Sequence, residues 1–396
     1  MCYIIIVYKT FEYRIYPTEY QKVLLEKHFG CCRWIYNYGL ARKIEHYTQT
    51  QKTLSRYDIR KNIPKLKAAE ETKWLSEVSS MSLTSALIHL DSAYQRFFKE
   101  KKGFPKFKSK HHSKDSYEIT EIVYFKGCLI SIPKFREGIK IIVHRPLIGE
   151  IRTCTVKKSK TGKYYIRILT KDNTELPTKP TPQREQAIGM DVGIKTFLVS
   201  SDGQKFDNPR YLDKSQRKLK RLNRSFSRKL VKGKPLSKNA EKNRVKLALA
   251  YEKVRFQRKD FLHKLSTKLI RENQTICVED LNVSGMLKNK YLARSLSDLG
   301  LGMFFQMLKY KSDWYGKNLL ECGRFEPSSK TCSVCGHIKR DLKLSDRKWT
   351  CTNCGAVHDR DENASQNVKN FAFVGIRADA EVTTAIDESL VIQNSN

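Results

Sequence analysis

Four cysteines in the last quarter of the chain have the spacing of metal ligands. They form two pairs, Cys332 with Cys335 and Cys351 with Cys354, and fifteen residues separate the pairs. This spacing is typical of a structural zinc site, in which four thiolates surround the ion and leave no open position for chemistry. A redox-active thiol pair is the alternative, but two pairs at this spacing favour zinc. Any catalysis must then come from other side chains.

Three carboxylates supply the second candidate site. Asp191 interrupts an apolar strand pattern, Glu279 ends another strand pattern, and Asp361 begins a helical pattern just after the second cysteine pair. Hydrolysis of a phosphodiester needs neutralised charge and an activated water, which two Mg²⁺ ions held by carboxylates supply. We therefore predict a site for two Mg²⁺ ions made by Asp191, Glu279 and Asp361.

Each of these acids also has an ordinary structural explanation. Asp191 could form a turn, and Glu279 could be a solvated residue at the end of a strand. Asp359 and Asp361 could cap a helix, where a carboxylate matches the helix dipole. A carboxylate on an apolar strand nevertheless needs a partner to offset the free energy of its burial. The three acids together therefore favour the metal site over three separate explanations.

The charge of the chain predicts a polyanionic partner. The 396 residues contain 76 Lys and Arg against 41 Asp and Glu, a net charge of +35, so self-repulsion opposes the compact state unless an anion screens it. Nucleic acid is the favoured partner, and a membrane surface the weaker one. The apolar run at residues 3–8 is too short for a membrane span and lacks the pattern of a secretion signal. We expect an intracellular, cytoplasmic protein associated with the nucleoid.

Two basic segments are candidates for contact with nucleic acid. Residues 205–260 hold 20 Lys and Arg against 5 Asp and Glu in a helical pattern, and residues 99–110 form a basic run interleaved with Phe. A solvated turn explains the second segment equally well. The candidate contact residues are Lys106, Lys108, Arg217, Lys218, Lys220, Arg221, Arg224 and Arg228. Within this set, Arg217, Lys220, Arg221 and Arg224 have the spacing of one helix face.

Hydrophobic periodicity gives the order of elements in the first half of the chain. A strand at residues 11–16 stops at Pro17, and a helix follows with Thr18 and Gln21 as a capping box. A second helix covers about 80–100, and short strands over 117–170, of which the first covers 117–125, suggest a β-barrel-like unit. The proline-rich segment 176–182 then marks a domain boundary.

The second half follows the order of an RNase H-like fold, with three antiparallel strands and two parallel additions. Its predicted elements are strands over 187–200 with a turn at Asp202 and Gly203, a helical hairpin broken near 233–235, a strand at 274–278, a helix from about Ser297, a strand at 319–325, the zinc ribbon and a helix near Asp361. Such a sheet can bring Asp191, Glu279 and Asp361 together. The polar, acidic residues 373–396 are expected to form a flexible tail.

Eight motifs in this order resemble the TnpB family of OrfB-type transposon proteins, which are related to type V CRISPR effector nucleases. They are YRIYP (13–17), RWIYN (33–37), EETKWLS (70–76), GFPKF (103–107), GMDVGIK (189–195), VEDL (278–281), PSSKTC (327–332) and HDRDENA (358–364). The resemblance covers nearly the whole chain and identifies it as a member of that family.

The resemblance implies a multidomain α+β protein whose nuclease is RuvC-like and split by a zinc ribbon. It implies a β-barrel wedge domain (1–16 and 117–175), a helical recognition domain (17–116), a RuvC-like nuclease domain (183–328 and 359–372) and a ribbon that contacts nucleic acid (329–358). In the family pattern, Asp191 and Asp361 match the first and last catalytic aspartates, and Glu279 matches the glutamate.

The activity implied by the resemblance is Mg²⁺-dependent, RNA-guided cleavage of both strands of a DNA duplex beside a short flanking motif. The implied partners are a transposon-derived guide RNA, double-stranded target DNA and, functionally, the transposon's own transposase. The alternatives are an RNA-guided regulator that binds DNA without cutting it, an accessory transposition protein and a DNA-joining transposase. A zinc-ribbon transcription factor would leave the three carboxylates unexplained.

Overall fold

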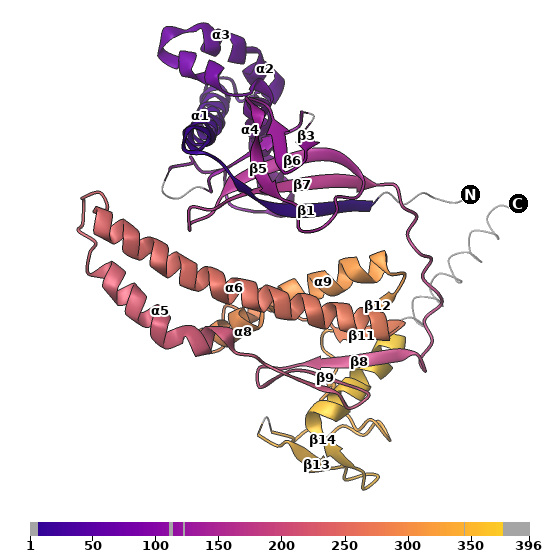
Figure 1. Ribbon diagram of the computed structural model, residues 1–396. Helices are drawn as coiled ribbons and strands as arrows, with labels where there is room; N and C mark the ends of the chain where they lie inside the picture. The colour runs from indigo at the N-terminus through magenta and orange to yellow at the C-terminus, as the bar shows by residue number, and fades with distance from the viewer. Residues whose placement is uncertain (1–6, 111–113, 122, 344, 375–396) are drawn as a thin grey trace, which may run out of the picture. The chain divides into compact units, whose positions relative to one another are not determined.

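The fold divides between Glu175 and Leu176, at the start of the proline-rich segment, into two units that are described separately here (Figure 1). The structure is a computed structural model that describes residues 7–110, 114–121, 123–343 and 345–374. The predicted acidic tail lies outside the described residues except for Phe373 and Val374. No helix in the described part of the chain is both long enough and apolar enough to cross a bilayer.

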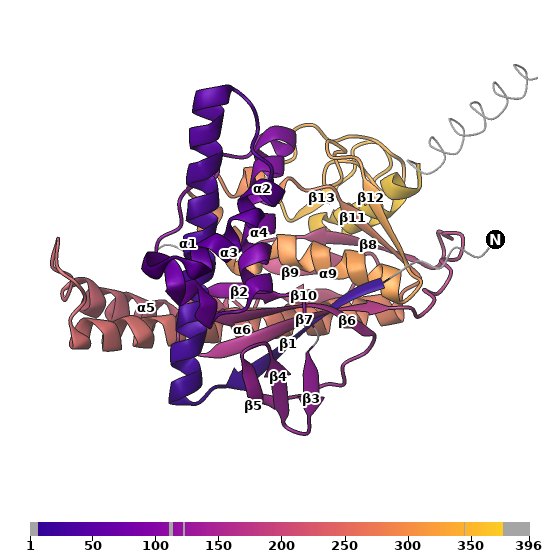
Figure 2. The same cartoon turned by 90° about the horizontal axis from the view of Figure 1, so that it is seen from above.

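The helices of the first unit pack around two long members. The helices are α1 (Glu19–Thr50), α2 (Arg56–Lys61), α3 (Ile63–Ala68), the 3₁₀ helix η1 (Glu70–Glu77) and α4 (Ser80–Glu100). The predicted capping box is confirmed: the Thr18 hydroxyl accepts from the Gln21 backbone N–H, and the Gln21 side chain accepts from the Thr18 N–H. α1 and α4 lie side by side, and Leu25 and Leu87 are buried in their shared core (Figure 2).

The strands of the first unit form one antiparallel sheet in the order β2-β6-β7-β1-β5-β4-β3. They are β1 (Val7–Tyr16), β2 (Ser116–Ile119), β3 (Tyr124–Lys126), β4 (Leu129–Ile132), β5 (Phe135–Ile142), β6 (Glu150–Lys158) and β7 (Tyr164–Asp172). β1 lies in the middle, between β7 and β5, and buries Tyr13 and Ile15. β2 and β3 are the two ends of this order and are not paired with each other in the described part of the chain, so the sheet is open and does not close into the predicted barrel.

The single strand predicted over residues 117–125 is wrong. β2 pairs with β6 and β3 pairs with β4, at opposite edges of the sheet. Between them, the Glu121 carboxylate accepts a hydrogen bond of 2.9 Å from the hydroxyl of Ser79, the residue that caps α4. This contact draws the chain out of the sheet toward the helix.

The second unit has a five-stranded sheet in the order β10-β9-β8-β11-β12. Its strands are β8 (Ala187–Val192), β9 (Thr196–Ser200), β10 (Lys205–Asp207), β11 (Thr275–Glu279) and β12 (Asn318–Cys322). β8, β9 and β10 pair antiparallel, whereas β11 lies parallel to both β8 and β12. This topology confirms the predicted RNase H-like order. Gly203, in the predicted turn between β9 and β10, has φ +84°, which glycine adopts without strain.

The helices of the second unit also follow the predicted pattern, with one correction. They are α5 (Tyr211–Ser227), α6 (Lys238–Glu272), α7 (Val283–Met286), α8 (Ala293–Leu299), α9 (Leu301–Trp314) and a helix over residues 360–374. α5 and α6 form the expected hairpin. The helix expected from Ser297 is two helices, because Gly300 between α8 and α9 takes the left-handed conformation with φ +71°.

Both faces of this sheet are covered. Ile188, Met190, Ile276 and Val278 pack against α6, α8 and α9, whereas Ala187 and Cys277 pack against Val368 and Ala372 of the helix over 360–374. In Figure 1, α6 and α9 lie on one side of the sheet and the helix over 360–374 on the other. Alternate residues of β8 and β11 therefore point to opposite helical layers.

Gly189 lets the helix over 360–374 approach the sheet. A Cβ placed on Gly189 would lie 2.0 Å from the backbone oxygen of Ser365 and 2.8 Å from the backbone nitrogen of Lys369. Both atoms belong to a helix backbone, which cannot rotate away as a side chain can. A residue larger than glycine must therefore push the helix off the sheet.

We predict that Gly189→Ala destabilises the protein by about 1–3 kcal/mol, the usual range for overpacking a tight contact. Chemical denaturation followed by circular dichroism measures this change. Gly302→Ala in α9 is the matched control, because its Cβ would meet only Val283 at 4.0 Å. Equal stability of Gly189→Ala and the wild type would contradict the close approach.

His28 of α1 is a buried, neutral residue in the first unit. Its ring lies 4.7 Å from that of Tyr117 and 5.6 Å from that of Phe135. Nδ1 donates to the backbone oxygen of Leu24 at 2.8 Å, and Nε2 has no hydrogen-bond partner among the described residues. Burial lowers the pKa of His28 to about 4, since a proton on Nε2 would place an unpaired charge in the core.

This residue makes the first unit sensitive to acid. Because the folded-state pKa lies below the unfolded value of about 6.5, the unfolded chain binds the proton first, and stability falls as pH drops from about 6.5 to 4. We predict a loss of about 3 kcal/mol over that range. His28→Phe should remove this part of the pH dependence in urea denaturation, and identical pH profiles for the two proteins would contradict it.

Candidate active site and metal centre

Asp191 and Glu279 lie on neighbouring strands and on the same face of the sheet. β8 and β11 pair in parallel with Cys277 opposite Gly189 and Val278 opposite Met190. One further residue along this register sets Glu279 beside Asp191. Both side chains share the face of Gly189 and Cys277, so they point toward the helix over 360–374. Neighbouring strands are about 4.8 Å apart, which places two carboxylates in one small region.

The helix over 360–374 brings the third carboxylate. The side chain of Asp359 accepts hydrogen bonds from the backbone N–H groups of Asp361 and Glu362, at 3.0 and 3.2 Å, and so caps this helix. Asp359 therefore has the capping role considered from the sequence, whereas Asp361 lies in the first turn with its carboxylate paired with Arg347. The cap and the close contact at Gly189 together set where Asp361 lies.

The electrostatics show that Glu279 and Asp361 both act on Asp191. The pKa of the half-buried Asp191 is raised to about 7, first by burial and then by the negative charges of Glu279 and Asp361. Arg360 and Arg347 oppose this rise. Arg347 also donates to both carboxylate oxygens of Asp361, at 3.3 and 3.4 Å. The structure thus gathers carboxylates that repel one another, as a binding site for cations does.

Oxygen ligands from three carboxylates suit Mg²⁺, a hard cation that prefers them. The carboxylates are less tightly gathered than the cysteines, because only the four cysteines, among the described residues, bring ligand atoms within 4.8 Å of one another. Glu279 is held in place by the Ser328 hydroxyl, which donates to it at 2.7 Å. Asp280, its neighbour in the chain, forms an ion pair with Arg324 instead.

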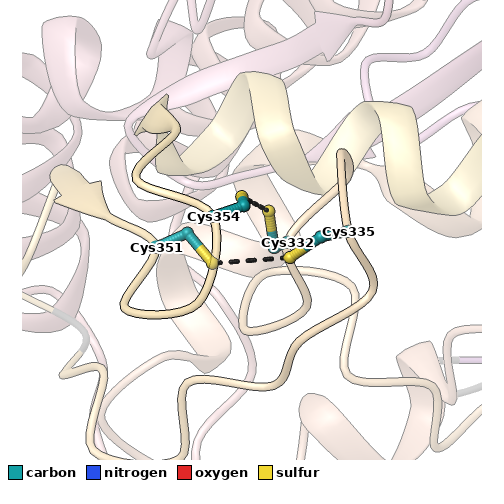
Figure 3. A group of neighbouring side chains, drawn as sticks. All are labelled: Cys332, Cys335, Cys351 and Cys354. Atoms are coloured by element: carbon teal, nitrogen blue, oxygen red, sulfur yellow. Dashed lines mark hydrogen bonds between the residues drawn. The ribbon is translucent and has the colours of Figure 1, made fainter.

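The four cysteines form the second candidate metal centre. The Sγ atoms of Cys332 and Cys354 are 3.7 Å apart, those of Cys335 and Cys351 are 3.6 Å apart, and all four lie within 4.8 Å (Figure 3). This arrangement fits the tetrahedral four-sulfur coordination of zinc. The ribbon also contains the hairpin of β13 (Lys348–Thr350) and β14 (Val357–Asp359).

The two cysteine pairs adopt the same turn. The N–H of Cys332 donates to the oxygen of His337, and that of Cys351 donates to the oxygen of Ala356, both at 2.8 Å. Gly336 and Gly355 follow the pairs with φ +77° and +73°. His358 lies beside the centre, with Nε2 3.1 Å from the sulfur of Cys332. The backbone therefore prepares both pairs to bind one ion.

Two amides connect this ribbon to the helix over 360–374. The side chains of Asn363 and Asn367, one turn apart, both donate to the backbone oxygen of Thr331, at 2.7 and 2.6 Å. Asn363 also accepts from the N–H of Ser333. Because Thr331 precedes the first cysteine, the position of the metal centre is linked to that of Asp361.

The predicted nucleic-acid contacts fall into two groups. Five of the six on α5 line a groove of about 560 Å³, namely Arg217, Lys220, Arg221, Arg224 and Arg228. Lys218 is exposed but does not line that groove. In the first unit Lys106 is exposed, whereas Lys108 is half-buried with its ammonium 3.7 Å from the centre of the Tyr36 ring.

Sequence reasoning missed the partners that hold the acids. Ser328 and Asn363 were visible only as letters of longer motifs, and Asn367 and Arg347 stood out in no pattern. The spacing of Asn363 and Asn367, four residues apart on a helix, was a usable signal, since it places both amides on one face. Nothing in the sequence showed that Arg347 would reach Asp361.

Three family models match the chain. OrfB_IS605, described as "Probable transposase", matches residues 165–290, and the Cas12f1-like TNB domain matches residues 302–368, which include the cysteine centre. A helix-turn-helix domain model, HTH_OrfB_IS605, matches residues 1–52. In the described part of that segment the structure has β1 and the single long helix α1.

Proteins and structures similar to this chain agree with these matches. A protein of Streptomyces pristinaespiralis named "Putative RNA-guided DNA endonuclease" is 38% identical, over 91% of this chain and 89% of its own. "TnpB-like protein L770" of Acanthamoeba polyphaga mimivirus is 23% identical, over 90% and 71%. The structure titled "Cryo-EM structure of the Cas12f1-sgRNA-target DNA complex" shares the fold, with a TM-score of 0.55 and 14% identity over 92% of this chain and 99% of that one. On these grounds the chain belongs to the TnpB family of OrfB-type transposon proteins.

Proposed function

We propose that this protein is an RNA-guided DNA endonuclease that hydrolyses phosphodiester bonds with Mg²⁺ held by Asp191, Glu279 and Asp361. The observation that carries the proposal is the convergence of these carboxylates from β8, β11 and the helix over 360–374, together with the raised pKa of Asp191. The name of the Streptomyces relative, which contains the words "RNA-guided DNA endonuclease", supports it.

The residues of the site have distinct tasks under this proposal. The three carboxylates would hold Mg²⁺, which would supply charge neutralisation for the phosphodiester and activation of the attacking water. Asp191 and Glu279 provide oxygen ligands from a rigid sheet, and Ser328 fixes the orientation of the Glu279 carboxylate. Asp361 provides a ligand from the helix, and its ion pair with Arg347 must rearrange or be shared when a cation binds.

The charge distribution supports a nucleic-acid substrate recognised by its backbone. The α5 groove gathers Arg and Lys side chains without an acidic residue in its lining. Phosphate contacts of this kind give affinity and strong salt dependence but no sequence preference. Selection of the target would then come from base pairing with a guide RNA, as in RNA-guided effectors generally. We propose that the flanking motif and the cutting of both strands follow the same family pattern.

The proposed division of labour follows the two units. In the second unit, residues 183–328 and 359–372 form the RuvC-like nuclease, and residues 329–358 form a zinc ribbon that contacts nucleic acid. In the first unit, the sheet with β1 and residues 117–175 acts as the wedge, and the helices over 17–116 act as the recognition domain. Zinc in the ribbon would be structural, since four thiolates saturate it.

The nuclease assignment predicts that Asp191→Ala lowers the rate of cleavage at least about 100-fold. Loss of a residue that only orients a metal ligand usually lowers activity about 10- to 100-fold, and loss of the ligand itself should have a larger effect. Protein purified with its co-expressed RNA is offered a plasmid with a matching target and varied flanking sequence, in Mg²⁺. RNA and DNA binding should be unchanged. Asp280→Asn is the matched control, because Asp280 adjoins Glu279 but pairs with Arg324. Wild-type cleavage by Asp191→Ala would refute the assignment, and target binding without cleavage by the wild type would favour the regulator.

Loss of one zinc ligand should disorder the ribbon and the first turn of the helix over 360–374, where Asp361 lies. Zinc binding contributes roughly 10 kcal/mol or more to folding in small zinc modules, so Cys351→Ser should lose the ion, expose the ribbon to proteases and abolish cleavage. Zinc content is measured by atomic absorption. Cys128→Ser is the control, because Cys128 is an exposed cysteine of the first unit, outside the ribbon. A Cys351→Ser protein with full zinc content and wild-type stability would be inconsistent with this role.

A further inference from the structure

The first unit contains a pocket of about 410 Å³ that the proposed nuclease chemistry does not use. Its size falls in the range of small-ligand sites. Three segments build it: the middle of α1, the end of η1, and the strap of residues 108–110. The strap is fixed, because the Asn37 side-chain amide donates to the backbone oxygen of Lys108 at 2.8 Å and accepts from its N–H at 2.7 Å. The pocket is therefore formed before any ligand enters.

One stripe of α1 forms the floor of the pocket. Lys27, Gly30, Cys31 and Trp34 all line it and follow the spacing of a single helix face. Gly30 is unusual, since glycine inside a helix is unfavourable compared with other residues. A Cβ on Gly30 would meet no atom within 4 Å. The glycine therefore leaves space in the pocket instead of allowing a close packing contact.

Two indole rings form an aromatic wall. Trp34 stacks on Tyr38 with ring centres 5.3 Å apart and an interplanar angle of 10°, and Trp74 meets Trp34 edge-on at 5.5 Å. The indole N–H of Trp74 donates to the backbone oxygen of Glu71, which fixes the ring, while 38% of Trp74 remains exposed. Rigid, partly exposed aromatic rings of this kind are platforms for nucleobases.

Cations surround this wall. Lys27, Arg33, Lys108 and Lys110 line the pocket against the single carboxylate of Glu77. Lys27 is paired with Glu77, and Arg33 is paired with Asp115 at 3.4 Å. On the fixed strap, Lys110 is exposed, whereas Lys108 is half-buried with its ammonium over the Tyr36 ring. An anionic ligand with a flat aromatic part would match both the charge and the aromatic wall.

We propose that this pocket binds one unstacked nucleotide of a single-stranded nucleic acid, with its base against Trp34 and Trp74 and its phosphate near Lys108 and Lys110. This inference rests on the proposed nucleic-acid function but concerns a different part of the chain from the nuclease site. The guide RNA and the displaced target DNA both present such nucleotides, so the chemistry is shared and the test must distinguish the two sources.

The test uses the full chain with short single-stranded RNA and DNA of the same sequence, each carrying one 5-iodouracil base. After irradiation, mass spectrometry should map the cross-link to Trp34 or Trp74. A higher yield with the RNA oligonucleotide identifies the guide RNA as the source of the nucleotide, and a higher yield with the DNA oligonucleotide identifies the displaced target strand. Gly30→Leu should fill the pocket and weaken binding of that oligonucleotide by about 10-fold, the scale of one base–aromatic stack. The slope of affinity against salt should stay unchanged, because no phosphate contact is lost.

The matched control is Gly30→Ala, which adds one methyl group in open space and favours the helix, as leucine also does. Gly30→Ala should bind like the wild type. The proposal would be overturned by cross-links confined to residues other than Trp34 and Trp74, or by a Gly30→Leu protein that binds the oligonucleotide as tightly as the wild type. Cross-linking does not depend on cleavage, so the two proposals can fail separately. If the protein cuts guided DNA but gives no cross-link to Trp34 or Trp74, only the proposed nucleotide pocket is refuted. If the cross-link forms but the protein never cuts DNA, only the proposed nuclease activity is refuted.

Discussion

Burial of the Asp191 carboxylate beside two other acids is the constraint on which the proposed site of the second unit depends. Separate acids would ionise in water near pH 4, yet Asp191 has a pKa of about 7 between Glu279 and Asp361. That difference corresponds to a cost of ionising Asp191 on the order of 4 kcal/mol, to which burial contributes first and the charges of Glu279 and Asp361 second. A cation bound by these carboxylates would relieve this cost, so under the proposed function the same cost would favour binding of Mg²⁺.

The surroundings of the acids resist this repulsion in identifiable ways. The parallel register of β8 and β11 fixes two carboxylates, and Gly189 allows the helix over 360–374 to press against them. The same helix is capped by Asp359 and tied through Asn363 to the chain just before Cys332. The position of the four cysteines is therefore connected to the geometry of the acidic site, and zinc bound by them would stabilise both. The ribbon can be remote from the chemistry and still be required for it.

Patterns of a few neighbouring residues were enough to predict the elements that such residues determine by themselves. The alternation around Asp191 predicted its strand, Thr18 and Gln21 predicted the start of α1, and the spacing of the cysteines predicted the metal centre. The order of strands and helices then sufficed for the RNase H-like sheet. The single acid on an apolar strand was the informative exception, because only a partner explains its burial.

Features that depend on distant parts of the chain were not predictable in this way. No local pattern showed that β1 lies between β5 and β7, or that residues 117–125 split between two edges of the sheet. No local pattern explained why residue 189 of β8 is glycine, because the reason is the helix that packs against it. Trp34 and Trp74 likewise belonged to separate motifs, and only the packing of η1 on α1 makes them one wall.

Crystals soaked in Mn²⁺, with data collected at the manganese and zinc absorption edges, test the central claim most directly. The account predicts manganese density bonded to oxygens of Asp191, Glu279 and Asp361, at about 2 Å as expected for small hard cations, and zinc density only among the four cysteines. Manganese that binds elsewhere, with these three carboxylates turned away from a common ion, would contradict it.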